Sequence, residues 1–279
     1  MAAIQVANRC DGDAALTGFP RLLVIYTIAI SVFLIAPVLI VMVAAFTSGD
    51  FIMFPPGGFS LRWFDQVLSD PQFIRPLWNS VRLGVAATII SGLLAIPAAL
   101  SLVRGVFPGR RWVETFLLAP LSLPTIILAI GLLFFASRIG LSNSFISLLA
   151  GHVVITVPYM LRTVLGVYAG VNREVEEAAR VLGADRWRTA WYVTLPIIRP
   201  GVLAGAIFAF LMSFDEVAVA LLLTNSDTTT LPVSILSYLV YNYDPAVAAI
   251  STIQIAIVIV ALLILERLFG IRHLMFASQ

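Results

Sequence analysis

Residues 174–196 read EVEEAARVLGADRWRTAWYVTLP and form the most polar stretch of an otherwise apolar chain. Asn172 is placed to N-cap a helix whose first turn is acidic, which suits the positive end of a helix. Gly183 supplies the residue without a Cβ that a C-terminal cap favours. Asp185 can N-cap a second helix, closed by Pro196 before the next apolar segment. The pattern predicts two short helices joined at an angle, suited to a groove on another protein; a lipid-facing amphipathic loop is the alternative.

The composition indicates a membrane protein. The chain has 279 residues, of which 60% are hydrophobic, and its mean hydropathy is +1.01. Soluble domains rarely exceed about 50% apolar residues, so this chain has more apolar surface than one soluble core could hide. Its net charge of +2 is too small to indicate a nucleic-acid partner. The bilayer is therefore the expected solvent.

Rare residue types exclude several kinds of site. All 17 basic residues are arginine, which excludes a phosphate-binding loop of the G-x-x-x-x-G-K-[ST] type, because that loop uses a lysine to reach the phosphates. Cys10 is the only cysteine, so internal disulfides and cysteine-clustered metal sites are excluded. His152 and His273 are far apart in the sequence, with no ligand spacing around either. We expect no catalytic residue, no metal site and no cofactor bound by this chain.

Apolar windows of about 20 residues predict an all-α integral membrane protein with six spans. The spans cover residues 22–46, 80–103, 115–136, 145–168, 201–223 and 246–265. The first contains 25 uncharged residues, whereas a signal-peptide core has about 7–15, so we expect it to remain uncleaved. The predicted organisation is an N-terminal tail (1–21), a six-helix membrane domain (22–266) and a C-terminal tail (267–279).

Arginine placement orients the spans. With a cytoplasmic N-terminus, 13 arginines fall in inner segments and four in or near outer ones. Those four are Arg62, Arg75, Arg82 and Arg138. This bias satisfies the positive-inside rule, which the reverse orientation would violate. Both termini and the polar stretch are therefore predicted to be cytoplasmic.

The two longer outer segments differ in kind. Residues 47–76 carry prolines, a glycine pair and aromatics, as expected of a partly ordered surface loop. Residues 224–245 have no basic residue. Within them, Leu231–Tyr241 is predicted to form a short amphipathic helix at the outer interface, with tyrosines at headgroup depth. An ordinary anchored loop is an equally good interpretation of these residues.

The polar stretch resembles a known family motif. The pattern E-A-A-x₃-G-x₉-I-x-L-P is matched by Glu177, Ala178, Ala179, Gly183, Val193, Leu195 and Pro196. Valine in place of isoleucine is the only departure. The stretch is similar to the EAA loop of binding-protein-dependent ABC importer permeases, and a loop between the fourth and fifth of six spans matches the type I layout of that family.

The resemblance implies that the loop, residues 172–196, is a coupling helix that docks into a cleft on an ATP-binding subunit and passes its closure to the spans. Glu177 would meet a basic group of that subunit, while Ala178 and Ala179 would pack in the cleft. Gly183 would allow the bend. The residues assigned to ATPase coupling are Glu177, Ala178, Ala179, Leu182, Gly183, Leu195 and Pro196.

The same resemblance implies a set of partners. Two copies of the ATP-binding subunit would hold ATP and Mg, which the present chain would not. A second permease subunit would complete the path, and a different chain is favoured over a second copy of this one. A periplasmic or lipid-anchored binding protein would deliver solute to residues 47–76 and 224–245. The location would be a bacterial inner membrane, among membrane lipids and without nucleic acid.

Two adjacent acids occur inside the predicted fifth span. Asp215 and Glu216 lie in AFLMSFDEVAVALLLT, and each charge at the centre of a membrane helix costs about 2.5–3.5 kcal/mol. Consecutive helical positions are about 100° apart, so one acid could line a central path while the other bonds a neighbouring helix. We assign Asp215, Glu216 and Ser213 to the substrate path; the alternative is that both acids are structural.

The residues around these acids look most like those of the second permease subunits of spermidine/putrescine-type importers. That resemblance implies a polyamine, and acidic side chains suit a polycation. Other solutes of the same importer class stay open, namely phosphonates and opine-like or other amino-acid derivatives. A secondary transporter would lack the EAA spacing. An enzyme is disfavoured because Ser213 has no evident histidine partner, and His152 is expected to be a lone packed residue.

Overall fold

The computed structural model describes residues 18–142 and 144–269. The predicted tails fall largely outside this range. In the part described, the chain is helical and has no β-strand, apart from an isolated bridge between Thr47 and Phe59. The α-helices are α1 (Gly18–Ala44), α2 (Arg62–Ser69), α3 (Pro71–Arg104), α4 (Arg110–Leu118), α5 (Thr125–Arg138), α6 (Phe145–Ala169), α7 (Arg173–Val181), α8 (Arg186–Thr189), α9 (Leu195–Phe214), α10 (Ala218–Leu223), α11 (Leu231–Tyr241) and α12 (Ala246–Phe269). A 3₁₀ turn, η1 (Ala119–Ser122), and a π turn, η2 (Ala190–Thr194), complete the set.

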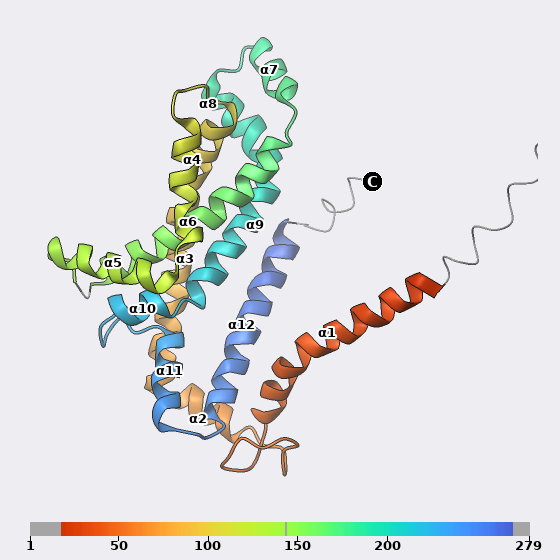
Figure 1. Cartoon of the computed structure of the whole chain (residues 1–279), viewed down its shortest axis with the longest axis vertical. Coiled ribbons are helices and arrows are strands. Elements are labelled where there is room, and N and C mark those ends of the chain that lie inside the picture. Colours follow the sequence, from red (N-terminus) through yellow and green to blue (C-terminus); the bar gives the residue numbers. More distant parts are fainter. Residues whose placement is uncertain (1–17, 143, 270–279) are drawn as a thin grey trace, which may run out of the picture. The chain divides into compact units, whose positions relative to one another are not determined.

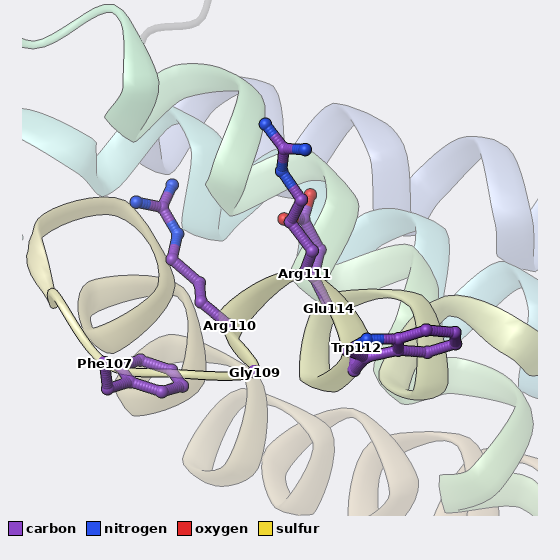
Figure 2. A pocket seen from close by; sticks show the side chains of 6 residues that line it. All are labelled: Phe107, Gly109, Arg110, Arg111, Trp112 and Glu114. Carbon is purple, nitrogen blue, oxygen red and sulfur yellow. The ribbon is translucent and has the colours of Figure 1, made fainter.

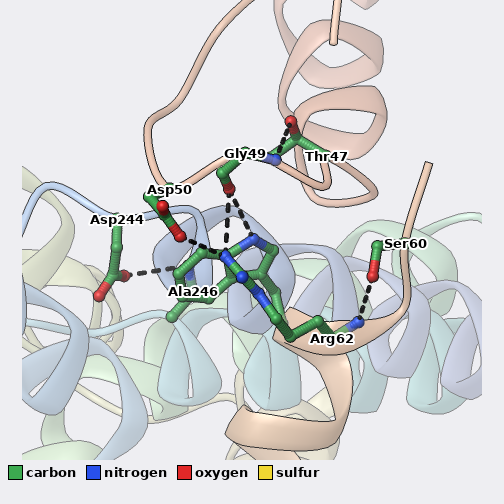
Figure 3. Close-up of polar contacts among 8 residues, drawn as sticks. Thr47, Gly49, Asp50, Ser60, Arg62, Asp244 and Ala246 are labelled. Carbon is green, nitrogen blue, oxygen red and sulfur yellow. Dashed lines mark hydrogen bonds and ion pairs between the residues drawn. The ribbon is translucent and has the colours of Figure 1, made fainter. Parts of the chain in front are cut away.

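The helices fall into two compact units. The first holds the described part of Met1–Asp65 together with Tyr243–Thr252. In it, the segment after α1 is held by polar contacts: Arg62 Nη2 lies 2.6 Å from Asp50 Oδ1, and Trp63 Nε1 donates to the Gly49 carbonyl at 3.2 Å (Figure 3). Part of the predicted outer loop is thus an ordered turn followed by α2.

The second unit holds Gln66–Asn242 and the described part of Ile253–Gln279. Its centre is formed by α3, α6 and α9, which pack against one another (Figure 1). Glycines permit this close approach, as small residues do between membrane helices. A Cβ added to Gly205 on α9 would lie 2.6 Å from Met160 Sδ on α6, and one on Gly201 would lie 2.8 Å from Val167 Cβ.

Within residues 18–142 and 144–269, five helices are long and apolar enough to cross a membrane, and a sixth candidate is a bent pair. That pair, Arg110–Ser122 with Thr125–Arg138, bends by 107°. The predicted third span, 115–136, is therefore not straight. The bend follows from Pro124, because a residue before proline is pushed into extended backbone, and Leu123 has φ −95° and ψ 139°.

The predicted fifth span, 201–223, is wrong at both ends. Residues Arg186–Phe214 form one continuous helical segment that contains an apolar window, so Pro196 does not close the second loop helix. The π turn η2 precedes this proline, with Leu195 N bonded to the Ala190 carbonyl, and it accommodates a residue that has no N–H to donate. The helix then ends at Phe214, and α10 starts at Ala218.

The predicted helix Leu231–Tyr241 is confirmed as α11. It packs on α3, where Ser234 Oγ donates to the Gln72 carbonyl at 2.9 Å. The Tyr238 ring lies 5.0 Å from that of Phe73 and is buried. The Tyr238 ring therefore fills the contact between α11 and α3, whereas Tyr241 is exposed; that the tyrosines of α11 lie at headgroup depth stays a prediction.

Candidate functional site

The polar loop folds as its capping residues predict. Asn172 Oδ1 accepts the Glu174 N–H at 3.0 Å and N-caps α7. The helix ends in a Schellman motif at Gly183, whose φ is +91°. Ala184 N donates to the Ala179 carbonyl at 3.1 Å, and Gly183 N donates to the Arg180 carbonyl at 3.0 Å. The predicted turn between two helices at Gly183 is confirmed.

The second helix of the loop starts at its predicted cap. Asp185 Oδ1 accepts the Arg188 N–H at 2.8 Å. From there the chain runs through α8 and η2 into α9 without a break. The second helix of the loop is therefore continuous with α9, one of the three central helices, whereas α7 is not.

The tip of the loop is open to the surroundings. Leu182 is 89% exposed and Val181 is 87% exposed, although both are apolar. Among the residues assigned to coupling, Glu177, Ala178, Gly183 and Pro196 are also exposed, while Ala179 and Leu195 are half-buried. An exposed apolar tip on a capped, rigid turn is a surface suited to a partner protein.

The two adjacent glutamates of α7 have different surroundings. Glu177 Oε1 lies 2.8 Å from Arg173 Nε in an exposed pair one helical turn apart. Such pairs contribute little, about 0.3–0.5 kcal/mol, so this carboxylate can exchange its partner. Glu176 is instead buried, because the next position on a helix points about 100° away.

Glu176 is a site residue that the sequence interpretation missed. Its Oε2 accepts from Arg104 Nε at 2.7 Å, and its Oε1 accepts from Tyr168 Oη at 2.8 Å and from Thr194 Oγ1 at 2.7 Å. Arg104 lies 72 positions away in the sequence, so nothing local distinguishes this glutamate from its neighbours. We call these four residues the Glu176 cluster.

The pKa of Glu176 is held below its ordinary value. Burial alone would raise the pKa of this carboxyl, but the hydrogen bonds from Thr194, Tyr168 and Arg104, with the positive charge of Arg104, outweigh it. Glu176 is therefore ionised at neutral pH, as the short ion pair with Arg104 requires.

A groove of about 850 Å³ lies between the end of α3 and the loop helices. Its charged lining includes Arg180 and Arg186 as well as the paired Arg104 and Glu176. A second hollow of about 510 Å³ lies at the start of α4 and is lined by Arg110, Arg111 and Glu114, among others (Figure 2). In both hollows arginines outnumber acidic side chains.

The acids of the fifth span lie at a helix break and not on a continuous helix. Asp215 is the C-cap of α9 and is exposed, and its Oδ1 accepts from Gln254 Nε2 at 3.3 Å. Glu216 is buried and caps α10, with Oε1 accepting the N–H groups of Ala218 at 2.9 Å and Val219 at 3.2 Å. The two acids therefore belong to two separate helix ends, and their directions are not set by the 100° step along one helix that the sequence predicts.

Ser213 does have a histidine partner, contrary to the expectation above. Its Oγ lies 2.8 Å from His152 Nδ1, and both residues are buried between α6 and α9. A second buried pair, Ser91 with Thr156 at 2.7 Å, joins α3 to α6. Such bonds satisfy polar groups inside a helix bundle. His152 and Ser213 are 61 positions apart in the sequence, so no local pattern predicts that they pair.

Known proteins share this sequence pattern and this helical fold. A family model described as binding-protein-dependent transport system inner membrane component matches residues 84–272. The chain belongs to this family. It is an ABC importer permease of type I, a transporter subunit and a multi-pass protein of the bacterial inner membrane.

Several curated proteins are similar to this permease. It is 28% identical over 232 residues to the spermidine/putrescine transport system permease protein PotC of Escherichia coli (strain K12), covering 83% of this chain and 88% of the relative. PotC of Haemophilus influenzae is 31% identical, with 76% and 82% covered. The diacetylchitobiose uptake system permease protein NgcG of Streptomyces coelicolor is 30% identical, with 86% and 83% covered.

Solved structures show the same fold. A bacterial ABC transporter that imports the acidic polysaccharide alginate has a TM-score of 0.70 at 16% identity, covering 93% of this chain and 99% of that chain. An amino acid ABC transporter has a TM-score of 0.58 at 18% identity, covering 76% and 98%. At these identities the likeness concerns the fold alone.

Proposed function

We propose that this permease forms half of the translocation path of an ATP-driven polyamine importer. A second permease subunit, favoured to be a different chain, forms the other half. Two ATP-binding subunits hold ATP and Mg and meet the α7–α8 loop, and a periplasmic or lipid-anchored protein delivers the solute. Relatives named as spermidine/putrescine permeases over about four fifths of this chain support the solute class.

The observation that carries the proposal is the exposed Asp215 carboxylate at the break between α9 and α10. The C-terminal end of a helix carries a partial negative charge of about half an elementary charge. Asp215 adds a full negative charge at that end. The N-terminal end of α10, which carries the partial positive charge, is already capped by the Glu216 carboxylate. The break therefore presents net negative charge to a ligand, which suits an ammonium group of a polyamine.

A neutral sugar derivative is the second candidate. The diacetylchitobiose permease is as similar to this chain as the polyamine permeases are, at 30% identity over 250 residues. A neutral solute would gain no charge attraction from Asp215. Phosphonates and other anionic solutes fit the negative break less well, because like charges repel inside a membrane, where screening by water is weak.

The test is uptake into proteoliposomes that hold the permease pair, the ATPase and the binding protein. We expect ATP-dependent accumulation of labelled spermidine, and a loss of roughly tenfold or more in Asp215→Asn, since removing one charged hydrogen-bond partner costs about 1.5–3 kcal/mol. Asp65→Asn, which removes an exposed acid on α2, is the control. Accumulation of diacetylchitobiose in place of spermidine would contradict the proposal of a polyamine solute, while the proposal of an ATP-driven importer would stand.

A further inference from the structure

The helix α7 has almost no apolar packing to hold it. Glu176 is its only buried residue, while Val181 at its last turn is exposed. A helix of nine residues is not stable by itself in water. Besides its covalent connections at either end, the buried contacts of Glu176 are therefore what fixes α7 to the rest of the second unit.

Those contacts reach all three central helices at one point. Arg104 is the last residue of α3, and Tyr168 lies one residue before the end of α6. Thr194 is the residue directly before α9. Each donates to the Glu176 carboxylate within 2.8 Å. A displacement of α7 would therefore move the adjacent ends of α3, α6 and α9 together.

The cluster is also braced internally. Arg104 Nη2 donates to the Val171 carbonyl at 2.8 Å, on the linker between α6 and α7. The Arg104 guanidinium lies over the Tyr168 ring, 4.7 Å from its centroid. Charge-assisted hydrogen bonds of this kind are short and strong, and a buried network whose members all have partners holds one geometry. The cluster therefore resists being pulled apart when α7 moves.

We propose that Glu176 is the positioning residue through which movement of α7 is passed to α3, α6 and α9. It acts behind Glu177, the exposed glutamate that faces the partner. The proposal rests on the proposed function, in which α7 docks on an ATP-binding subunit. The exposed tip contacts the ATP-binding subunit and moves with it. The Glu176 cluster couples this movement to α3, α6 and α9, so that ATP hydrolysis and solute movement influence each other.

The experiment compares Glu176→Gln with the same substitution at the adjacent, exposed Glu177 in the reconstituted importer. Glutamine keeps an oxygen that accepts from Tyr168 and Thr194 but loses the charge that holds Arg104. Four quantities are measured: the yield of assembled complex, basal ATP hydrolysis, its stimulation by the solute-loaded binding protein, and uptake. For Glu176→Gln we expect assembly and basal hydrolysis near wild type, with stimulation and uptake reduced about tenfold.

Tyr168→Phe keeps the proposal testable if Glu176→Gln fails to assemble. It removes a single hydroxyl donor, and we expect a smaller loss of stimulation, about three- to fivefold, at unchanged assembly. Normal stimulation and uptake in both variants would overturn the inference. So would a loss of uptake in Tyr168→Phe that is fully explained by a lower yield of complex, since that indicates a merely structural residue.

The wild-type complex separates this inference from the proposed function. If the loaded binding protein does not stimulate ATP hydrolysis in wild type, the proposed function fails, whatever the variants do. If wild type is stimulated and Glu177→Gln loses stimulation while Glu176→Gln keeps it, docking through α7 holds and the inference about Glu176 falls.

Discussion

At the scale of single residues, neighbours in the sequence have opposite surroundings. Glu176 is enclosed by three donors, whereas Glu177 is exposed and paired with Arg173. Asp215 and Glu216 divide in the same manner between an exposed helix end and a buried cap. In each pair one carboxylate is committed to the fold, and the other is available to a ligand or partner.

Protonation of Glu176 should weaken the fold at low pH. Its pKa is lower in the folded chain than the ordinary value of 4.5, so its contribution is complete above that value and is lost as pH falls through it and then through the folded pKa. We expect the difference in melting temperature between wild type and Glu176→Gln to be constant near neutral pH and to narrow below about pH 4.5. A difference in melting temperature that widens in acid would contradict a stabilising role for the ionised Glu176.

Substitutions of Gly183 should separate backbone strain from steric clash. The φ of +91° disfavours residues with a Cβ, yet a Cβ there would meet no atom within 4 Å. Left-handed backbone costs an ordinary residue roughly 1–2 kcal/mol and asparagine less. We therefore expect Gly183→Val to reduce uptake and melting temperature more than Gly183→Asn does. Equal losses would mean that the turn does not need this conformation.

At the scale of elements, α6 and α9 approach closely where α9 carries glycine. A Cβ on Gly205 would lie 2.6 Å from Met160 Sδ, and also 3.2 Å from Met160 Cα, which cannot rotate away. On α6 itself, a Cβ on Gly166 would meet no atom within 4 Å. The two glycines thus differ in function, one serving the helix contact and the other not.

Alanine at these two positions should have opposite effects. Gly205→Ala forces the helices apart and should destabilise the chain by about 1–3 kcal/mol, as overpacking does. Gly166→Ala should be neutral or stabilise by up to about 1 kcal/mol, because alanine favours the helix. Melting temperatures of the purified variants in detergent check both. If Gly205→Ala is as stable as Gly166→Ala, the α6–α9 contact is looser than described.

At the scale of the whole molecule, the placement of arginine predicts the orientation across the bilayer. The 13 arginines assigned to inner segments predict that the loop after α3 is cytoplasmic. Val106 in that loop is 99% exposed, and Phe59, in the predicted outer segment, is 79% exposed. Because Cys10 is the only cysteine, a cysteine-free background needs one substitution.

Cysteine labelling in spheroplasts tests the orientation. In a Cys10→Ser background, a membrane-impermeant maleimide should label Phe59→Cys directly. It should label Val106→Cys only after the membrane is permeabilised. The reverse pattern would place both termini outside and would remove the α7–α8 loop from the reach of a cytoplasmic ATPase.

The sequence by itself determined the features that depend on local chemistry. Apolar length predicted the membrane helices, capping residues predicted the ends of α7 and the start of α8, and Gly183 marked the left-handed turn between them. The bounds of α11 followed in the same way. These signals succeed because a cap or an apolar stretch acts within a few residues of itself.

Only the tertiary structure decided which polar residues meet. The breaks at Leu123 and Asp215 interrupt segments that are apolar enough to read as single spans. Glu176 was indistinguishable from its neighbours until Arg104, from a helix 72 positions away, was seen beside it. Whether a carboxylate connects helices or is left to bind a ligand depends on the hydrogen-bond donors around it. In a helical membrane protein those donors come from other spans, which local sequence does not identify.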